Sequence, residues 1–357
     1  MIKKFVKSCL KAALFISLYP LILFIIVKAT DYSILFDIKK HKMVMPVIMN
    51  IRGYSMSQEE KIIFKKINPF GFILHGNSFK TKEQVIELID SIRALFPDRK
   101  VYFFTDQEGG EADRLERIGS PKSPSAKYYG EIARDNMVEA KTQLYNHVSA
   151  TSGFLREIGM DVNLAPVLDI FYAENGKSAS IGSRSYSHDI DIVTELGKVF
   201  TKASHDNGLH TTIKHIPGLS NSLLDTHEDK VVIDTKLEIL EKTDFMPFKS
   251  LSKSTKFAMV NHVIYSDIDD KPASISAKTI DIIRKKIGFD GLIISDAFNM
   301  KAISDYDVSS IVQMSFNAGV DIVMPNIISI RISKQVIDEI DEEIVLRFNK
   351  KIKALGL

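Results

Sequence analysis

Short apolar runs alternate with amphipathic helical patterns along the chain from about residue 43 to the C-terminus. Eight of these runs are almost continuously hydrophobic, which is typical of strands that are buried on both faces of a parallel sheet. The predicted strands span residues 43–50, 71–76, 101–106, 161–168, 209–214, 257–263, 291–296 and 320–324. Eight β/α units of this kind predict an α/β fold, a single TIM-type (β/α)8 barrel over residues 31–357.

Two of the intervening segments carry clear helix signals. Thr81 and Gln84 have the spacing of a capping box, apolar residues follow at helical intervals, and Pro97 ends the pattern. Residues 276–287 repeat the helical spacing and are followed by Gly288, a residue type that commonly ends helices.

The first 30 residues depart from this pattern. A basic stretch ending at Lys11 precedes an apolar run, 12–27, which Lys28 closes. This arrangement predicts either a signal peptide or a short membrane anchor. No small-x-small cleavage site precedes Asp31, so we expect an uncleaved anchor. Because four lysines precede the apolar run and one follows it, we expect the body outside the cytoplasm on the inner membrane, with secretion after cleavage as the alternative.

Composition narrows the possible classes of protein. With 45% hydrophobic and 26% charged residues, the chain is that of an ordinary globular protein rather than a disordered one. Residues 1–30 carry five lysines and no acid, so the remainder of a chain with net charge +2 carries −3, which argues against nucleic acid as a partner. Cys9 is the only cysteine, which excludes an intrachain disulfide and cysteine-based metal or thiol chemistry in the globular part.

Polar residues collect where the predicted strands end, and the active sites of such barrels form at these ends. The third strand ends at Asp106, with Glu108, Gly109 and Gly110 next, and Asp169 follows the fourth. Lys214 and His215 stand at the end of the fifth strand, Asn261 and His262 at the end of the sixth, and Asp296 at the end of the seventh. Further along the chain, Asp225 and His227 are two residues apart, so extended backbone would place both side chains on one face. One of the pair could then orient the other.

With these residues identified, the chain resembles the single-domain β-N-acetylglucosaminidases of glycoside hydrolase family 3, which trim peptidoglycan fragments. The resemblance covers about residue 43 to the C-terminus and rests on six motifs in order. They are Asp106-Gln107-Glu108-Gly109-Gly110, Asn163-Leu164-Ala165-Pro166-Val167-Leu168-Asp169, Ile181-Gly182-Ser183-Arg184-Ser185-Tyr186, Lys214-His215-Ile216-Pro217-Gly218, Asp225-Thr226-His227 and Ile294-Ser295-Asp296.

The resemblance implies retaining hydrolysis of terminal β-linked N-acetylglucosamine from a glycan, without a cofactor or a metal. It implies that Asp296 is the nucleophile and that His227 is the general acid and base. An imidazole titrates near neutral pH, which suits both proton transfers, and Asp225 would orient the ring. The residues implied to bind the sugar are Asp106, Arg114, Arg184, Lys214 and His215.

Two positions differ from the family's pattern. Glu111 stands where the family usually has a basic residue, and Leu219-Ser220 stands where it has His-Gly. These differences bear on substrate subsites and on the loop after the fifth strand. They leave the reaction type unchanged, because the three implied catalytic residues are all present.

Two other functions remain open from the residues alone. One is a catalytically silent barrel that binds glycans. The other is a metal-dependent hydrolase that uses His210, His215, His227 and Asp296, although the first strand lacks a His-x-His pair. Single residues also have structural interpretations: a helix cap for Asp296, a backbone-orienting role for Asp169, and either core or pocket for His262. We expect His41, His75, His147, His188, His205 and His210 to be surface or packing residues.

Overall fold

The computed structural model describes residues 43–51, 53–171, 181–219, 230–325 and 336–357. The chain divides into two units, residues 1–42 and 43–357, and all described residues belong to the second. The predicted anchor, Asp225 and His227 therefore lie outside the described residues. From Met43 onward, no described helix combines the length and apolar character that a membrane span requires.

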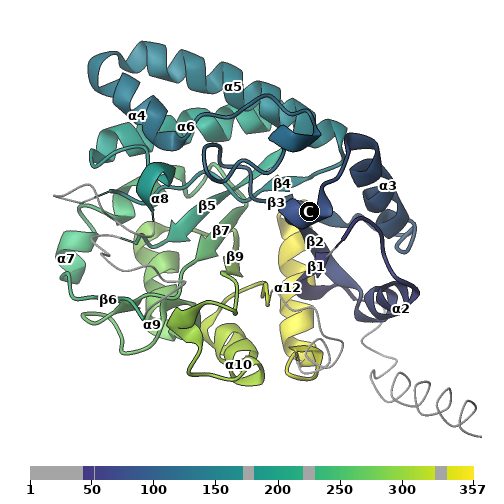
Figure 1. The fold of residues 1–357 in the computed structure, drawn as a ribbon. Coiled ribbons are helices and arrows are strands. Elements are labelled where there is room, and N and C mark those ends of the chain that lie inside the picture. Colours follow the sequence, from purple (N-terminus) through teal and green to yellow (C-terminus); the bar gives the residue numbers. More distant parts are fainter. Residues whose placement is uncertain (1–42, 52, 172–180, 220–229, 326–335) are drawn as a thin grey trace, which may run out of the picture. The chain divides into compact units, whose positions relative to one another are not determined.

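Seven strands form one curled parallel sheet, in the order β1-β2-β3-β4-β5-β7-β9 (Figure 1). These strands are β1 (Met45–Ile51), β2 (Pro69–Leu74), β3 (Tyr102–Thr105), β4 (Val162–Asn163), β5 (His210–Ile216), β7 (Phe257–Val260) and β9 (Leu292–Ser295). A second small sheet pairs β6 (Val232–Ile233) with β8 (Ile264–Tyr265) in parallel. The α/β class and the parallel sheet predicted from the sequence are confirmed.

Helices connect the strands and lie outside the sheet within this unit (Figure 1). They are α2 (Gln58–Ile67), α3 (Lys82–Arg93), α4 (Ala126–Asp135), α5 (Met137–Glu157), α6 (Ile190–Asp206), α7 (Leu237–Leu240), α8 (Phe245–Leu251), α9 (Ala277–Ile282), α10 (Val308–Ala318) and α12 (Glu342–Ala354). Helix α3 begins as predicted, since the Thr81 side chain accepts a hydrogen bond from Gln84 N. After α9 the chain continues as one π-helical turn, which ends at Gly288 with φ 77°.

The eighth predicted run, residues 320–324, joins the two edges of the sheet through single bridges instead of forming a regular strand. Ile322 pairs in parallel with Ile294 of β9, and Val323 pairs in parallel with Val47 of β1. Ile48 N donates to Val323 O at 3.0 Å. The sheet therefore curls until its first and last strands flank the same short segment.

Each strand of the main sheet differs from its predicted bounds by at least one residue, and two of these differences bear on the site. The regular part of the fourth is only Val162–Asn163, because Pro166 has no N–H to continue a ladder, although Leu168 N still donates to Lys214 O at 2.7 Å. The fifth reaches Ile216, so His215 lies within the strand instead of after it.

Aromatic side chains fill the inside of the curled sheet. The rings of Phe70, Phe104 and Phe257 pack against one another, with centroids 5.9–6.4 Å apart, and Phe348 of α12 meets Phe70 edge-on at 5.4 Å. All four side chains are at most 2% exposed. These apolar side chains fill the interior of the sheet. The polar groups lie instead at the C-terminal ends of the strands.

Candidate active site

A pocket of about 410 Å³ lies at the C-terminal ends of the strands. All five residues that the sequence predicts to bind sugar line it, together with the predicted nucleophile. The remaining lining residues are Ile73, His75, Glu108, Glu111, Ala112, Met259, Ala297, Asn299, Met300 and Met324. The structure thus brings together predicted site residues that are up to 190 positions apart in the chain, from Asp106 to Asp296.

Four charged side chains form one largely buried cluster in this pocket. Lys214 Nζ lies 2.8 Å from Asp106 Oδ1 and 2.6 Å from Glu108 Oε1, and the lysine side chain is only 2% exposed. Arg184 binds the same glutamate with two bonds, Nε to Oε2 at 2.7 Å and Nη2 to Oε1 at 2.8 Å. This fork geometry orients the guanidinium as well as holding it.

All four side chains of the cluster remain charged because each lies close to groups of opposite charge. Burial by itself raises the pKa of Glu108 and of Asp106, but the nearby cations outweigh it and both pKa values fall below their usual range. Burial likewise lowers the pKa of Lys214, yet the two carboxylates raise it overall. Lys214 is therefore a cation that donates hydrogen bonds and cannot act as a base near neutral pH.

Hydrogen bonds to Asp169 hold His215 at the wall of the pocket. Its Nδ1 lies 2.7 Å from Asp169 Oδ2, and its backbone N donates to the same oxygen at 3.1 Å. Asp169 Oδ1 accepts from Leu219 N at 2.8 Å. The backbone-orienting role expected for Asp169 is confirmed, and the carboxylate also contacts the imidazole.

Asp296 projects from the end of β9 at one wall of the pocket. Its backbone N donates to Val260 O at 3.0 Å, which fixes it beside β7, and its Oδ1 accepts from Ala297 N at 2.7 Å. The next helical turn begins only at Lys301, with Met300 as its N-cap and no side-chain cap. The helix-cap interpretation of Asp296 is therefore wrong.

His262 is a core residue directly behind Asp296. It is 1% exposed, its Nδ1 lies 2.7 Å from Ser274 Oγ, and its Nε2 lies 3.2 Å from Ala297 O. Burial lowers its pKa, which the negative charge of Asp296 only partly offsets. His262 thus supports the backbone next to Asp296 from the core side.

Two titratable pocket residues, Glu108 and His75, were not among the predicted site residues. Glu108 was placed at a strand end, but its spacing gave no sign that it would bind both Lys214 and Arg184. His75, expected to be a surface or packing residue, lines the pocket instead. Its position directly after the buried run that ends at Leu74 was the available signal.

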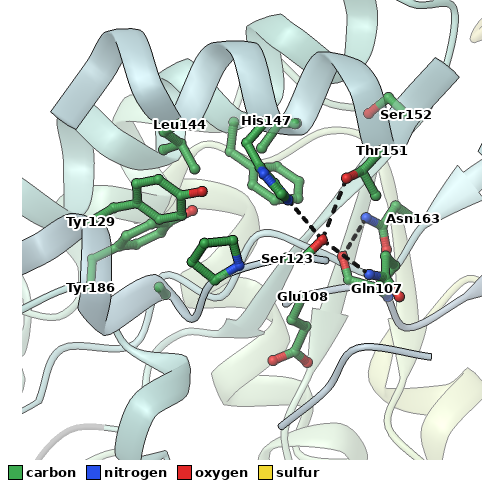
Figure 2. A pocket seen from close by; sticks show the side chains of 14 residues that line it. Gln107, Glu108, Ser123, Tyr129, Leu144, His147, Thr151, Ser152, Asn163 and Tyr186 are labelled. Carbon is green, nitrogen blue, oxygen red and sulfur yellow. Dashed lines mark hydrogen bonds between the residues drawn. The ribbon is translucent and has the colours of Figure 1, made fainter. Parts of the chain in front are cut away.

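A polar network behind the pocket holds the loop that carries Asp106 and Glu108. Gln107 N donates to Asn163 Oδ1 at 3.0 Å, and Asn163 Nδ2 donates back to Gln107 O at 2.8 Å. Figure 2 shows Ser123 between His147 and Gln107, with His147 Nε2 2.9 Å from Ser123 Oγ. These residues surround a cavity of about 20 Å³, enough for roughly one water molecule.

The described residues do not assemble the donors of the metal-dependent alternative. Over the described ranges, no three His, Cys, Asp or Glu side chains are placed to hold a metal ion. His210 begins β5 and lines a separate hollow, whereas His215 is five residues further along that strand, about 16 Å away in extended chain. His210 therefore cannot share an ion with His215 and Asp296.

The chain matches known proteins over most of its length. Residues 35–350 match the model of the glycosyl hydrolase family 3 N-terminal domain. A β-hexosaminidase from Xylella fastidiosa is 30% identical over 282 residues, which is 78% of this chain and 82% of that protein.

Solved structures agree with this match. Native NagZ from Neisseria gonorrhoeae is 28% identical and has a TM-score of 0.76, with 87% of this chain and 90% of that chain covered. The same protein in complex with N-trifluoroacetyl-D-glucosamine is 27% identical with a TM-score of 0.76, covering 88% and 94%. The sequence match, the curled parallel sheet and the carboxylate-lined pocket agree: the chain belongs to glycosyl hydrolase family 3 and is a glycoside hydrolase.

Proposed function

We propose that the protein is a retaining β-N-acetylglucosaminidase, which hydrolyses terminal β-linked N-acetylglucosamine from peptidoglycan-type glycans. One observation carries the proposal: the cluster of Asp106, Glu108, Arg184 and Lys214 shares a pocket with Asp296. Its β-hexosaminidase relatives and the related structure with an N-acylated glucosamine support the same substrate class.

The pocket has the size and chemistry that a terminal sugar requires. Its volume of about 410 Å³ lies within the range of small-molecule sites. Charged donors and acceptors converge on one side and can bind several hydroxyl groups. Met259, Met300 and Met324 supply apolar, largely buried surface, suited to the carbon faces of the ring and to an acetamido methyl group.

Hydrolysis proceeds in two steps under this proposal. An oxygen of Asp296 forms a bond to the anomeric carbon while the glycosidic C–O bond breaks, and the leaving oxygen receives a proton from His227. Water then attacks the anomeric carbon, gives its proton to His227, and releases Asp296. Asp225 would orient the imidazole throughout; this acid–base pair lies outside the described residues.

The proposal extends to fold and location. We infer a TIM-type (β/α)8 barrel, supported by the bridges that residues 320–324 make to β1 and β9. The basic and apolar composition of residues 1–30 supports an inner-membrane anchor with the enzyme outside the cytoplasm. Membrane fractionation of the full chain and of a variant lacking residues 1–30 tests this point: recovery of both in the soluble fraction would contradict it.

Turnover of an aryl β-N-acetylglucosaminide by purified protein tests the activity. We expect the phenol to be released and the sugar product to appear first as its β-anomer. Proton NMR of the anomeric signal detects which anomer forms first. Protein that binds N-acetylglucosamine but releases no product would be the silent glycan-binding barrel. A product that appears first as the α-anomer would contradict retention. Activity that survives a chelator would exclude the metal-dependent alternative.

A further inference from the structure

Asp169 is a buried carboxylate that influences the pocket without lining it. Its side chain is 0% exposed, and it is absent from the residues that surround the pocket, whereas His215 is among them. Both contacts of Oδ2 go to His215, to the backbone N and to ring Nδ1. Asp169 can therefore act on a ligand only through a neighbour that touches it.

The 2.7 Å contact between Asp169 Oδ2 and His215 Nδ1 determines which ring nitrogen carries a proton. A carboxylate oxygen only accepts hydrogen bonds, so Nδ1 must be the donor. When the ring is neutral, Nε2 then has a lone pair and no proton. Arg184 Nη2, which can only donate, lies 3.5 Å from Nε2, and this placement agrees with an acceptor at Nε2.

The ring of His215 is also fixed in direction. Its backbone N is bound by Asp169, and its backbone O accepts from Asn261 Nδ2 at 3.0 Å and from Gly218 N at 2.9 Å. The residue is 7% exposed. With backbone and ring both bound, the ring is oriented before any ligand arrives, which limits the ordering cost of binding. A sugar hydroxyl that donates to Nε2 would replace the 3.5 Å contact of Arg184 Nη2.

We propose that Asp169 is a positioning residue that fixes His215 as a hydrogen-bond acceptor, and that the sugar group bound there is a hydroxyl that donates its proton to Nε2. The carbonyl oxygen of an acetamido group carries lone pairs only, so it would face the lone pair of Nε2 without a proton between them. The carbonyl therefore belongs to the donors elsewhere in the pocket. This inference rests on the proposed function, because it takes the ligand to be an N-acetylated sugar.

Nitrogen NMR of protein labelled with ¹⁵N-histidine, recorded at pH 8, tests the tautomer directly. The His215 signals are assigned by their loss in the His215→Asn variant. We expect a protonated Nδ1 and an unprotonated Nε2 in the wild-type protein. In the Asp169→Asn variant the amide can turn its NH₂ toward Nδ1, which moves the ring proton to Nε2.

Kinetics with aryl glycosides provide the second measurement. We expect Asp169→Asn to raise KM by about tenfold, the scale of one lost hydrogen bond to a ligand. Among monodeoxy analogues of the substrate, one should lose kcat/KM in the wild-type enzyme and show little further loss in Asp169→Asn, which identifies the hydroxyl bound by His215. Ser185→Ala is the matched control, since it removes the bonds from Ser185 Oγ to the backbone O of Asp169 and of Ser187 and leaves the carboxylate of Asp169 in contact with His215.

Each outcome bears on the inference. A wild-type spectrum with the proton of His215 on Nε2 would overturn it, and this measurement needs no activity, only a folded His215→Asn variant for the assignment. An Asp169→Asn variant that folds and keeps the wild-type tautomer and KM would also overturn it, as would an equal rise in KM in Ser185→Ala. Wild-type protein that hydrolyses no N-acetylglucosaminide would refute the proposed function instead, while the tautomer would still be measured.

Discussion

Glu108 Oε1 lies 2.6 Å from the ammonium nitrogen of Lys214, and neither side chain is more than 7% exposed. The sequence separates these residues by 106 positions, and the curled sheet brings the ends of β3 and β5 to one pocket. Taking such charges out of water is unfavourable unless each has a close partner. The site therefore depends on all its charges being present together.

Lys214→Met should both destabilise the protein and abolish sugar binding. The substitution leaves Asp106 and one side of Glu108 without their cation in a buried site, and breaking a buried pair in this way costs about 3–5 kcal/mol. Urea unfolding and binding of N-acetylglucosamine measure the two effects. The control is Lys253→Met, whose partner Asp290 lies 2.7 Å away at the surface, with side chains 67% and 74% exposed. That change should cost less than about 1 kcal/mol, and equal losses in the two variants would contradict the buried-cluster account.

Glu108→Gln should remove part of the protein's sensitivity to acid. The cations lower the pKa of Glu108 from 4.5, so its stabilisation is complete above about pH 4.5 and is lost as pH falls toward the lower pKa of the folded state. The difference in unfolding free energy between wild type and variant should therefore stay constant from pH 5 to 9 and shrink below pH 4.5, by up to about 1.4 kcal/mol per pH unit. Denaturant titrations at these pH values measure it; a difference that grows on acidification would contradict the direction of the pKa shift.

Gly130→Ala should destabilise the protein although alanine favours helices. A Cβ added at Gly130 in α4 would lie 1.6 Å from the backbone O of Tyr186, so the segment that carries Arg184 would have to move. We expect a loss of about 3 kcal/mol and a raised KM, because Arg184 lines the pocket. Thermal unfolding and kinetics measure both effects.

Gly153→Ala in α5 is the matched control. A Cβ there would meet only Asn207 Oδ1, at 3.9 Å. This substitution should stabilise the protein by about 0.5–1 kcal/mol, through helix propensity alone. A stabilising effect at both glycines would show that α4 and the Tyr186 segment are not in contact.

Asp296→Ala and His227→Ala should separate the two chemical roles. We expect Asp296→Ala to lose at least about 1000-fold in kcat on every substrate, because no covalent intermediate can form. His227→Ala should reduce kcat far more for sugar leaving groups than for activated phenols, since a phenol of low pKa leaves without a proton. Rates on a disaccharide and on a nitrophenyl glycoside provide the comparison. Equal loss of kcat on both substrates would argue against His227 as the acid.

The sequence by itself determined the α/β class, the order of the strands and most of the pocket's members. Continuous apolar runs leave little choice but strands buried on both faces, and parallel strands place their C-terminal residues at one edge. For this reason Asp106, Lys214 and Asp296 could be placed together before any coordinates.

Only the tertiary structure decided which charge meets which. The double contact of Glu108, the pocket position of His75 and the orientation of His215 by Asp169 arise between segments far apart in the chain. Local sequence patterns carry no information about which side chains from distant segments will be in contact. Side-chain pairing across a curled sheet is set by its curvature and by the packing of Phe70, Phe104 and Phe257 inside it, which appear only when the whole chain has folded.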